Sequence, residues 1–166
     1  PAFDNKTGVV LQYKKGTDAV TIETRICLTK YYREQGINKF FLVFETIKKD
    51  SSCHVCAPQI GSAIFMHDGI DWRLRKINHG IITSGAHGRA PECKFINIGP
   101  DSYAILFEPV YTMNGEYSAS IFIIGERANT IDLLLDLDYR TDFNNSGQCR
   151  MAQEKAMPVD YPLCFG

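Results

Sequence analysis

The sequence lacks any run of uncharged apolar residues that approaches the roughly 18 needed to cross a bilayer as a helix, so no membrane span is expected. It has no internal repeat, no low-complexity tract and no linker. The formal net charge is only −1, which argues against a general nucleic-acid binder. With 45% hydrophobic and 22% charged residues in a chain of 166, the composition predicts a single globular domain over residues 1–166.

Motifs of catalysis are also missing. There is no G-x-S-x-G elbow and no phosphate-binding loop, and the only histidine near the C-x-x-C pair lies inside it, which excludes a c-type haem site. Ser84 and His87 are close in the sequence, but no third partner for a hydrolase is indicated. We therefore expect a protein without a cofactor that turns over no substrate.

Six cysteines are present, an even number that is above average for this length. Such a set is typical of an oxidising compartment, so a periplasmic or secreted protein is predicted. The first residues show no basic segment followed by an apolar run, as in a chain from which a leader has been removed. Cys149 and Cys164 flank a loop-like run and are expected to pair, which would stabilise the fold by about 3 kcal/mol.

The most distinctive motif is Cys53-His54-Val55-Cys56. A strand-like segment follows it, whereas a thiol oxidoreductase needs a helix that starts at the first cysteine. Structural disulfides are therefore predicted, either between Cys53 and Cys56 or from each of them to another cysteine. The alternative is a metal-binding or thiol-redox protein centred on this motif. Its ligands would be drawn from Cys53, His54, Cys56 and Cys93, because zinc and copper accept nitrogen and sulfur donors.

Alternation of apolar and polar residues predicts mainly antiparallel β structure, as a sandwich-like meander. Three strands over 103–107, 117–124 and 131–139 form the meander, with Asn114-Gly115 as a hairpin turn. Leu133, Leu135 and Leu137 share one face of the last strand and are expected to be buried.

Further strands are predicted over 39–47, 60–66, 70–77 and 95–98, with a hairpin turn at 67–69 and a long glycine-rich loop over 80–91. Residues 17–35 fit two patterns. Thr17 and Asp18 resemble a helix cap and Gly36 a helix end, which favours one N-terminal helix packed against the mainly β sheet, with an α+β fold as the alternative. A strand is the alternative because apolar residues also alternate.

Charge is uneven along the chain. Residues 1–94 hold 14 basic and 9 acidic residues, whereas residues 95–166 hold 4 and 10. Such an asymmetry can steer a partner of opposite charge. We expect instead that the two segments interleave in one sheet, so that their fields largely cancel.

These features favour a disulfide-stapled, non-catalytic module that binds another protein in its compartment, as an inhibitor or an immunity-type protector does. Glycine-rich loops more often carry binding contacts than catalysis. Tryptophan and arginine are common anchors of interfaces. The predicted contact residues come from the loop and from the start of the strand before it. They are Trp72, Arg73, Ser84, His87 and Arg89.

Overall fold

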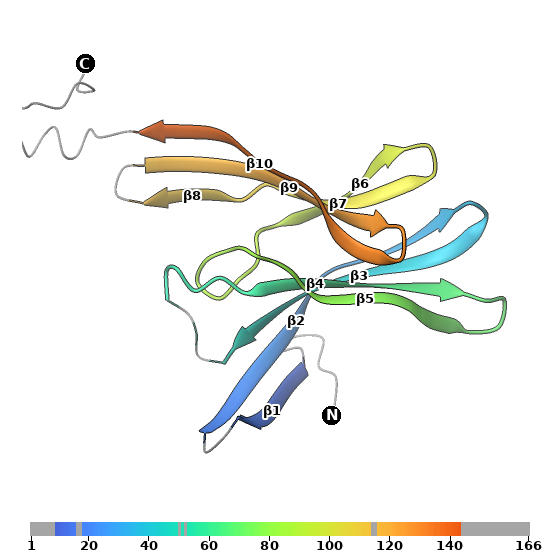
Figure 1. Cartoon of the computed structure of the whole chain (residues 1–166), viewed down its shortest axis with the longest axis horizontal. Coiled ribbons are helices and arrows are strands. Elements are labelled where there is room, and N and C mark those ends of the chain that lie inside the picture. Colours follow the sequence, from blue (N-terminus) through green and yellow to red (C-terminus); the bar gives the residue numbers. More distant parts are fainter. Residues whose placement is uncertain (1–8, 16–17, 50, 52, 114–115, 144–166) are drawn as a thin grey trace, which may run out of the picture.

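The computed structural model describes residues 9–15, 18–49, 51, 53–113 and 116–143. Within them, ten strands form two antiparallel sheets that pack face to face (Figure 1). The first sheet has the order β1 (Val9–Lys15), β2 (Asp18–Glu34), β3 (Ile37–Lys48), β4 (Gln59–His67) and β5 (Trp72–Thr83). The second has the order β10 (Thr130–Phe143), β9 (Glu116–Arg127), β7 (Ser102–Phe107) and β6 (Cys93–Gly99), with β8 (Val110–Met113) also paired to β9.

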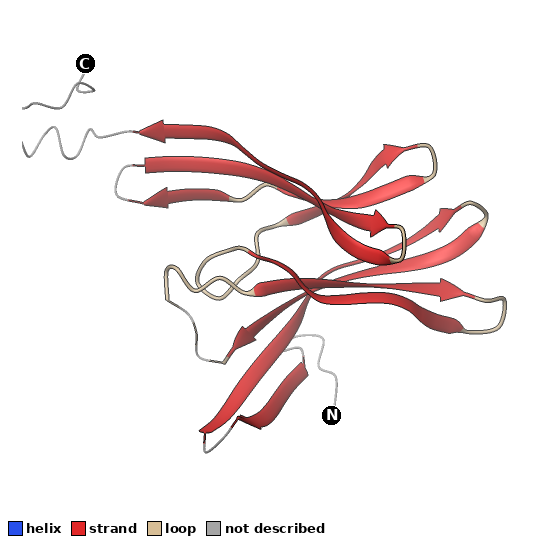
Figure 2. Cartoon of the chain, viewed as in Figure 1, coloured by secondary structure: helices blue, strands red, loops and turns tan. Residues whose placement is uncertain are grey.

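Figure 2 shows only strands and loops in the described part of the chain, which confirms the predicted sandwich-like antiparallel β fold. No helix among these residues has the length and hydropathy of a membrane span.

The core lies between the two sheets. Alternate residues of β3 and β4 point inward and meet alternate residues of β7, β9 and β10, as the two-residue period of a strand requires. The rings of Phe107 and Phe122 stack with their centroids 4.5 Å apart. The fully buried members of this core are Phe41, Val43, Ile60, Ile64, Ile105, Phe107, Phe122, Ile124 and Ile131.

The helix expected over 17–35 is wrong, because Asp18–Glu34 is strand β2. Gln35 and Gly36 both have positive φ, 49° and 78°, and join β2 to β3 as a two-residue hairpin turn. Gly36 therefore ends a strand rather than a helix. An extra residue at Cys27 makes a bulge in the pairing with β3, so the apolar alternation changes phase halfway along the strand.

The other expected strands are present, and β7, β9 and β10 form the predicted three-strand meander. The hairpin between β4 and β5 turns at residues 68–71, where the Asp68 carboxylate accepts hydrogen bonds from the backbone N–H groups of Ile70 and Asp71. Asn114-Gly115 lies outside the described residues, as do Cys149 and Cys164. The loop expected over 80–91 is shorter, because β5 continues to Thr83.

The expected burial of Leu135 and Leu137 is also wrong. A bulge at Leu134 shifts the pairing of β10 with β9, so that Leu133 lies opposite Ile124 but Leu135 lies opposite Ile123. Leu133 packs against the core, whereas Leu135 and Leu137 are 41% and 49% exposed on the outer face. One extra residue thus moves the later leucines to the other side of the sheet.

This register predicts an order of stability for two matched variants. Leu133→Ala removes a side chain that packs on the core, so we expect it to lower the free energy of unfolding by about 2–3 kcal/mol. Leu135→Ala changes an exposed side chain and should cost less than about 1 kcal/mol. Urea midpoints of the two variants measure the difference, and the reverse order would contradict the bulge.

The basic and acidic parts of the chain do not interleave, contrary to the expectation from the sequence. Residues 9–83, which build the first sheet, hold 11 basic and 7 acidic residues. Residues 93–143, which build the second, hold 3 basic and 8 acidic residues. The two layers of the sandwich therefore carry charges of opposite sign.

Candidate functional site

The glycine-rich loop over 84–92 connects the two sheets and is held by backbone hydrogen bonds. Ser84 N–H donates to the Pro58 carbonyl at 3.2 Å, and Gly88 N–H donates to the Cys56 carbonyl at 2.7 Å. Gly85 and Gly88 have φ of 120° and 71°. A Cβ at Gly85 would lie 1.9 Å from the Arg89 carbonyl oxygen, so no larger residue fits there without a shift of the backbone. The loop is a fixed structure with glycine where its tight turn requires it.

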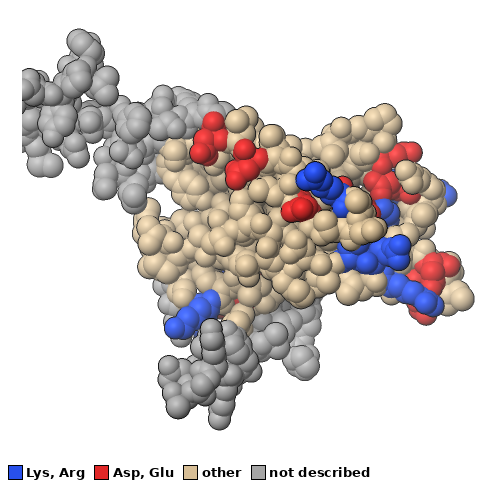
Figure 3. All heavy atoms as spheres, in the orientation of Figure 1, with Lys and Arg blue, Asp and Glu red and all other residues tan. Residues whose placement is uncertain are grey.

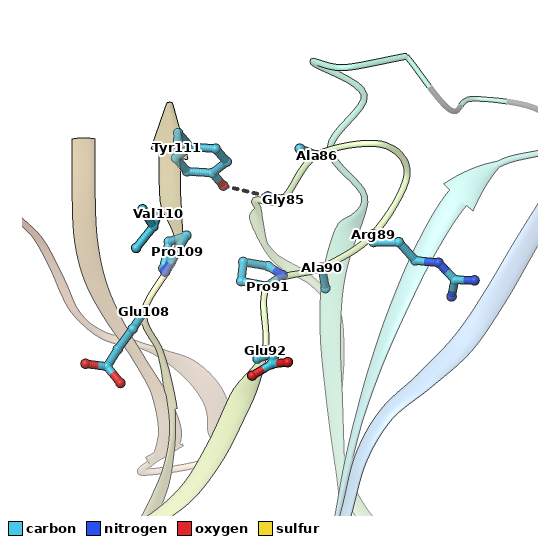
Figure 4. Close-up of a pocket in the computed structure, with 10 residues that line it drawn as sticks. All are labelled: Gly85, Ala86, Arg89, Ala90, Pro91, Glu92, Glu108, Pro109, Val110 and Tyr111. Atoms are coloured by element: carbon cyan, nitrogen blue, oxygen red, sulfur yellow. Dashed lines mark hydrogen bonds between the residues drawn. The ribbon is translucent and has the colours of Figure 1, made fainter. Parts of the chain in front are cut away.

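A pocket of about 380 Å³ lies between this loop and residues 108–111, which join β7 to β8 (Figure 4). Pro91 faces Pro109, Val110 and Tyr111 across it, and polar and apolar atoms contribute to the walls in nearly equal measure. Glu92 and Glu108 place two carboxylates toward one end of the same site (Figure 4). The volume is within the range typical of ligand pockets, about 300–1,000 Å³.

Tyr111 fixes the loop side of the pocket. Its hydroxyl oxygen accepts a hydrogen bond from Gly85 N–H at 2.8 Å and lies 3.0 Å from Ser84 Oγ (Figure 4). Ser84 itself is buried, at 9% exposure. The Ser84 hydroxyl is thus engaged with a tyrosine, and the ring of the exposed His87 contacts that of His54. The arrangement is one of loop positioning and does not resemble an activated nucleophile.

Arg89 belongs to the loop, but its guanidinium points away from the pocket (Figure 4). It pairs with the buried carboxylate of Glu45 on β3, at 3.3 Å. Glu45 also accepts a hydrogen bond from Ala90 N–H and forms an ion pair with Arg25 on β2 at 3.0 Å. Arg25 in turn donates to the Gly88 carbonyl at 2.6 Å. Arg25 and Glu45, both on the first sheet, therefore fix the position of the loop.

The segment next to the loop contains the disulfide predicted from the sequence, Cys53–Cys56. The His54 and His87 rings meet edge to face with centroids 4.8 Å apart. Cys93, the fourth residue of the suggested metal set, lies on β6 and packs against the core. In the part of the chain that the structure describes, no three histidine, cysteine or acidic side chains are grouped as metal ligands.

Trp72 and Arg73 do not join this site. They begin β5, whereas Ser84, His87 and Arg89 follow its end, and a strand of 12 residues spans roughly 35 Å. Figure 1 places the two ends of β5 at opposite sides of the first sheet. Trp72 is 43% exposed and its ring contacts Tyr31 and His67. The five predicted contact residues thus divide into two separate surfaces.

The second wall of the pocket, residues 108–111, was not predicted from the sequence. The only local signal there is Pro109, which interrupts the strand pattern after Phe107. Comparison of the chain with models of protein families, with curated proteins and with solved structures finds no match.

Proposed function

We propose that this chain is a non-catalytic binding module that takes an extended segment of a partner protein into the pocket between loop 84–92 and residues 108–111. The observation that carries the proposal is the pocket itself. It has fixed glycine-containing backbone on one side and the side chains of Val110, which is exposed, and Tyr111 on the other. A pre-formed site loses little conformational entropy when a ligand binds. It is therefore better suited to recognition than a flexible surface loop.

The chemistry of the lining suggests the class of segment. Pro91 and Tyr111 offer flat apolar surfaces of the kind that bind proline or aliphatic side chains. Glu92 adds negative charge toward one end, which suits a lysine or arginine of the partner, whereas the Glu108 carboxylate is already paired with Lys94 at 2.9 Å. The proposed ligand is therefore an extended segment with an apolar residue beside a basic one.

The proposed setting is the periplasm or the outside of the cell. The Cys53–Cys56 disulfide supports it, because such bonds persist where thiols are oxidised. A protein that binds without turnover in this setting would act as an inhibitor or as an immunity-type protector of its partner.

The test selects binders from a library of random extended peptides displayed on phage. Val110 is 51% exposed in the pocket wall, so Val110→Arg should block the site with little effect on folding. We expect enrichment of peptides with adjacent apolar and basic residues, and Val110→Arg should weaken their binding by about tenfold or more. Ile37→Arg, an equivalent change at the β2–β3 hairpin, is the control and should leave affinity unchanged. Failure to enrich peptides, or equal affinity of both variants, would contradict the proposal.

A second candidate is metal or thiol chemistry at Cys53–Cys56. One observation favours it, the contact of the His54 and His87 rings beside the disulfide, since reduction would leave two thiols near two imidazoles. Stoichiometric zinc or copper in the reduced protein, lost in Cys53→Ser, would support this function over peptide binding.

A further inference from the structure

Strands β7 and β8 pair with β9 in one continuous register. The offset stays the same from Ala104 opposite Gly125 to Met113 opposite Glu116, so β7 and β8 form one long strand that residues 108–109 interrupt. Strand β6 covers the outer edge of the β7 part alone. Among the residues that the structure describes, β8 therefore pairs with β9 on one side and has an open edge on the other.

The backbone groups on the open edge of β8 follow from this pairing. Ser120 N–H donates to the Pro109 carbonyl at 3.2 Å, so Pro109 lies in a hydrogen-bonded pair with β9. Such pairs alternate along an antiparallel ladder. Tyr111 therefore also bonds to β9, whereas the N–H and C=O groups of Val110 and Thr112 point the other way. Within the described part of the chain, these outward groups have no backbone partner.

The loop that leads into β6 turns away from this edge instead of closing it. Continuation of the β6–β7 register would place Ala90 opposite Val110 and Gly88 opposite Thr112. However, Ala90 N–H donates to the buried Glu45 carboxylate on the first sheet, and Gly88 N–H donates to a carbonyl of the disulfide segment at 2.7 Å. The pocket of about 380 Å³ lies where a continued strand would run (Figure 4).

We infer that the extended segment of the partner binds as an added strand beside β8, in line with β6 and in the same direction. The inference rests on the proposed function and specifies how that site recognises its ligand. An antiparallel segment supplies the alternating donors and acceptors that Val110 and Thr112 require. The main chain of the ligand then contributes to affinity, and the pocket selects its side chains.

The register also orders the residues of the bound segment. Its residue opposite Tyr111 shares a face with that side chain, whose hydroxyl bonds to Gly85 N–H, so it points toward the loop and should be apolar. The segment then runs toward Glu92, so a basic residue should follow the apolar one. Figure 3 shows acidic side chains over the left-hand part of the second sheet, the part to which β8 belongs in Figure 1, which favours the same order of residues.

The first test probes the backbone of the ligand and uses the wild-type protein. A peptide from the phage selection is synthesised with one N-methylated amide at a time, and calorimetry gives the Kd of each version. Alternate residues of an added strand direct their N–H groups at β8. Methylation at every second position of the bound stretch should therefore weaken binding by about tenfold or more, and at the positions between by less than about twofold.

The second test removes one outward donor of β8. Val110→Pro deletes an N–H group that does not pair with β9, so the sheet should be retained, and urea midpoints check this. Val110→Ala keeps the N–H group and is the matched control. We expect Val110→Pro to bind the peptide about tenfold more weakly than Val110→Ala does.

The outcomes separate this inference from the proposed function. Failure to enrich peptides, or binding that Val110→Arg leaves intact, would contradict both. Peptides that need the pocket but show no alternation on N-methylation, or bind Val110→Pro and Val110→Ala equally, would overturn the added strand and leave the pocket as a side-chain site. A wild-type dimer that Val110→Pro abolishes would also overturn it, because a second copy would then occupy the edge.

Discussion

Cys27 and Cys93 should resist alkylation in the folded protein far more than ordinary thiols do. Burial, as the largest cause, raises the pKa of Cys27 to about 12 and that of Cys93 to about 11, from an ordinary value of 9.0. Glu45 raises the first further, and Glu92 raises the second. Since the thiolate is the reactive form, the rate with iodoacetamide at pH 8 should fall by about 1,000-fold for Cys27 and about 100-fold for Cys93.

Mass spectrometry of native and unfolded protein without reductant measures these rates. Unfolding should expose both thiols to rapid labelling, whereas Cys53 and Cys56 should be labelled only after reduction. The same groups predict a pH dependence. For a thiol whose pKa is higher in the folded than in the unfolded state, the stabilisation is complete below the unfolded value of about 9. It is lost as the pH rises above that value, so the free energy of unfolding should decline there. Rapid labelling of Cys27 in the native state would contradict the prediction.

The class of the fold follows from local patterns, whereas its register does not. Alternation identifies most strands because each has one face in a core, and the period of two is visible in the sequence. The bulges at Cys27 and Leu134 each add one residue whose effect depends on the neighbouring strand. For this reason the helix expected at 17–35 and the buried faces expected for Leu135 and Leu137 are wrong, although the strand at 131–139 is correct.

The candidate site shows the same division between local and distant information. Glycines at 85 and 88 mark a tight loop, and that loop lines the pocket. Its other wall at Val110 and Tyr111 comes from a segment about 20 residues later, and only the packing of the two sheets brings it near. Trp72 does not belong to the same surface. It is close to the loop in the sequence, but strand β5 lies between them, so the two are separated in space by the full length of that strand.

Loss of the Glu126 carboxylate should destabilise the contact between the two sheets. This carboxylate on β9 accepts hydrogen bonds from Lys39 Nζ at 2.9 Å and Lys76 Nζ at 2.5 Å, and so links the second sheet to β3 and β5 of the first. The lysine side chains are each only 9% exposed. Burial alone would raise the pKa of Glu126, but the bonds from both lysines outweigh it and hold the pKa below the ordinary value of 4.5.

Glu126→Gln leaves two buried ammonium groups without this partner, although Lys39 keeps its contact with Glu34. We expect a loss of about 2–4 kcal/mol in the free energy of unfolding, less than for a fully buried pair because Glu126 is 27% exposed. Glu108→Gln, which removes an exposed pair with Lys94, is the control and should leave the urea midpoint nearly unchanged. Because the pKa of Glu126 is lower in the folded state, its carboxylate stabilises the protein above pH 4.5, and this stabilisation is lost as the pH falls. The free energy of unfolding should therefore decline less between pH 5 and pH 3 in Glu126→Gln than in the wild type. Equal midpoint shifts in the two variants would show that the carboxylate does not join the sheets.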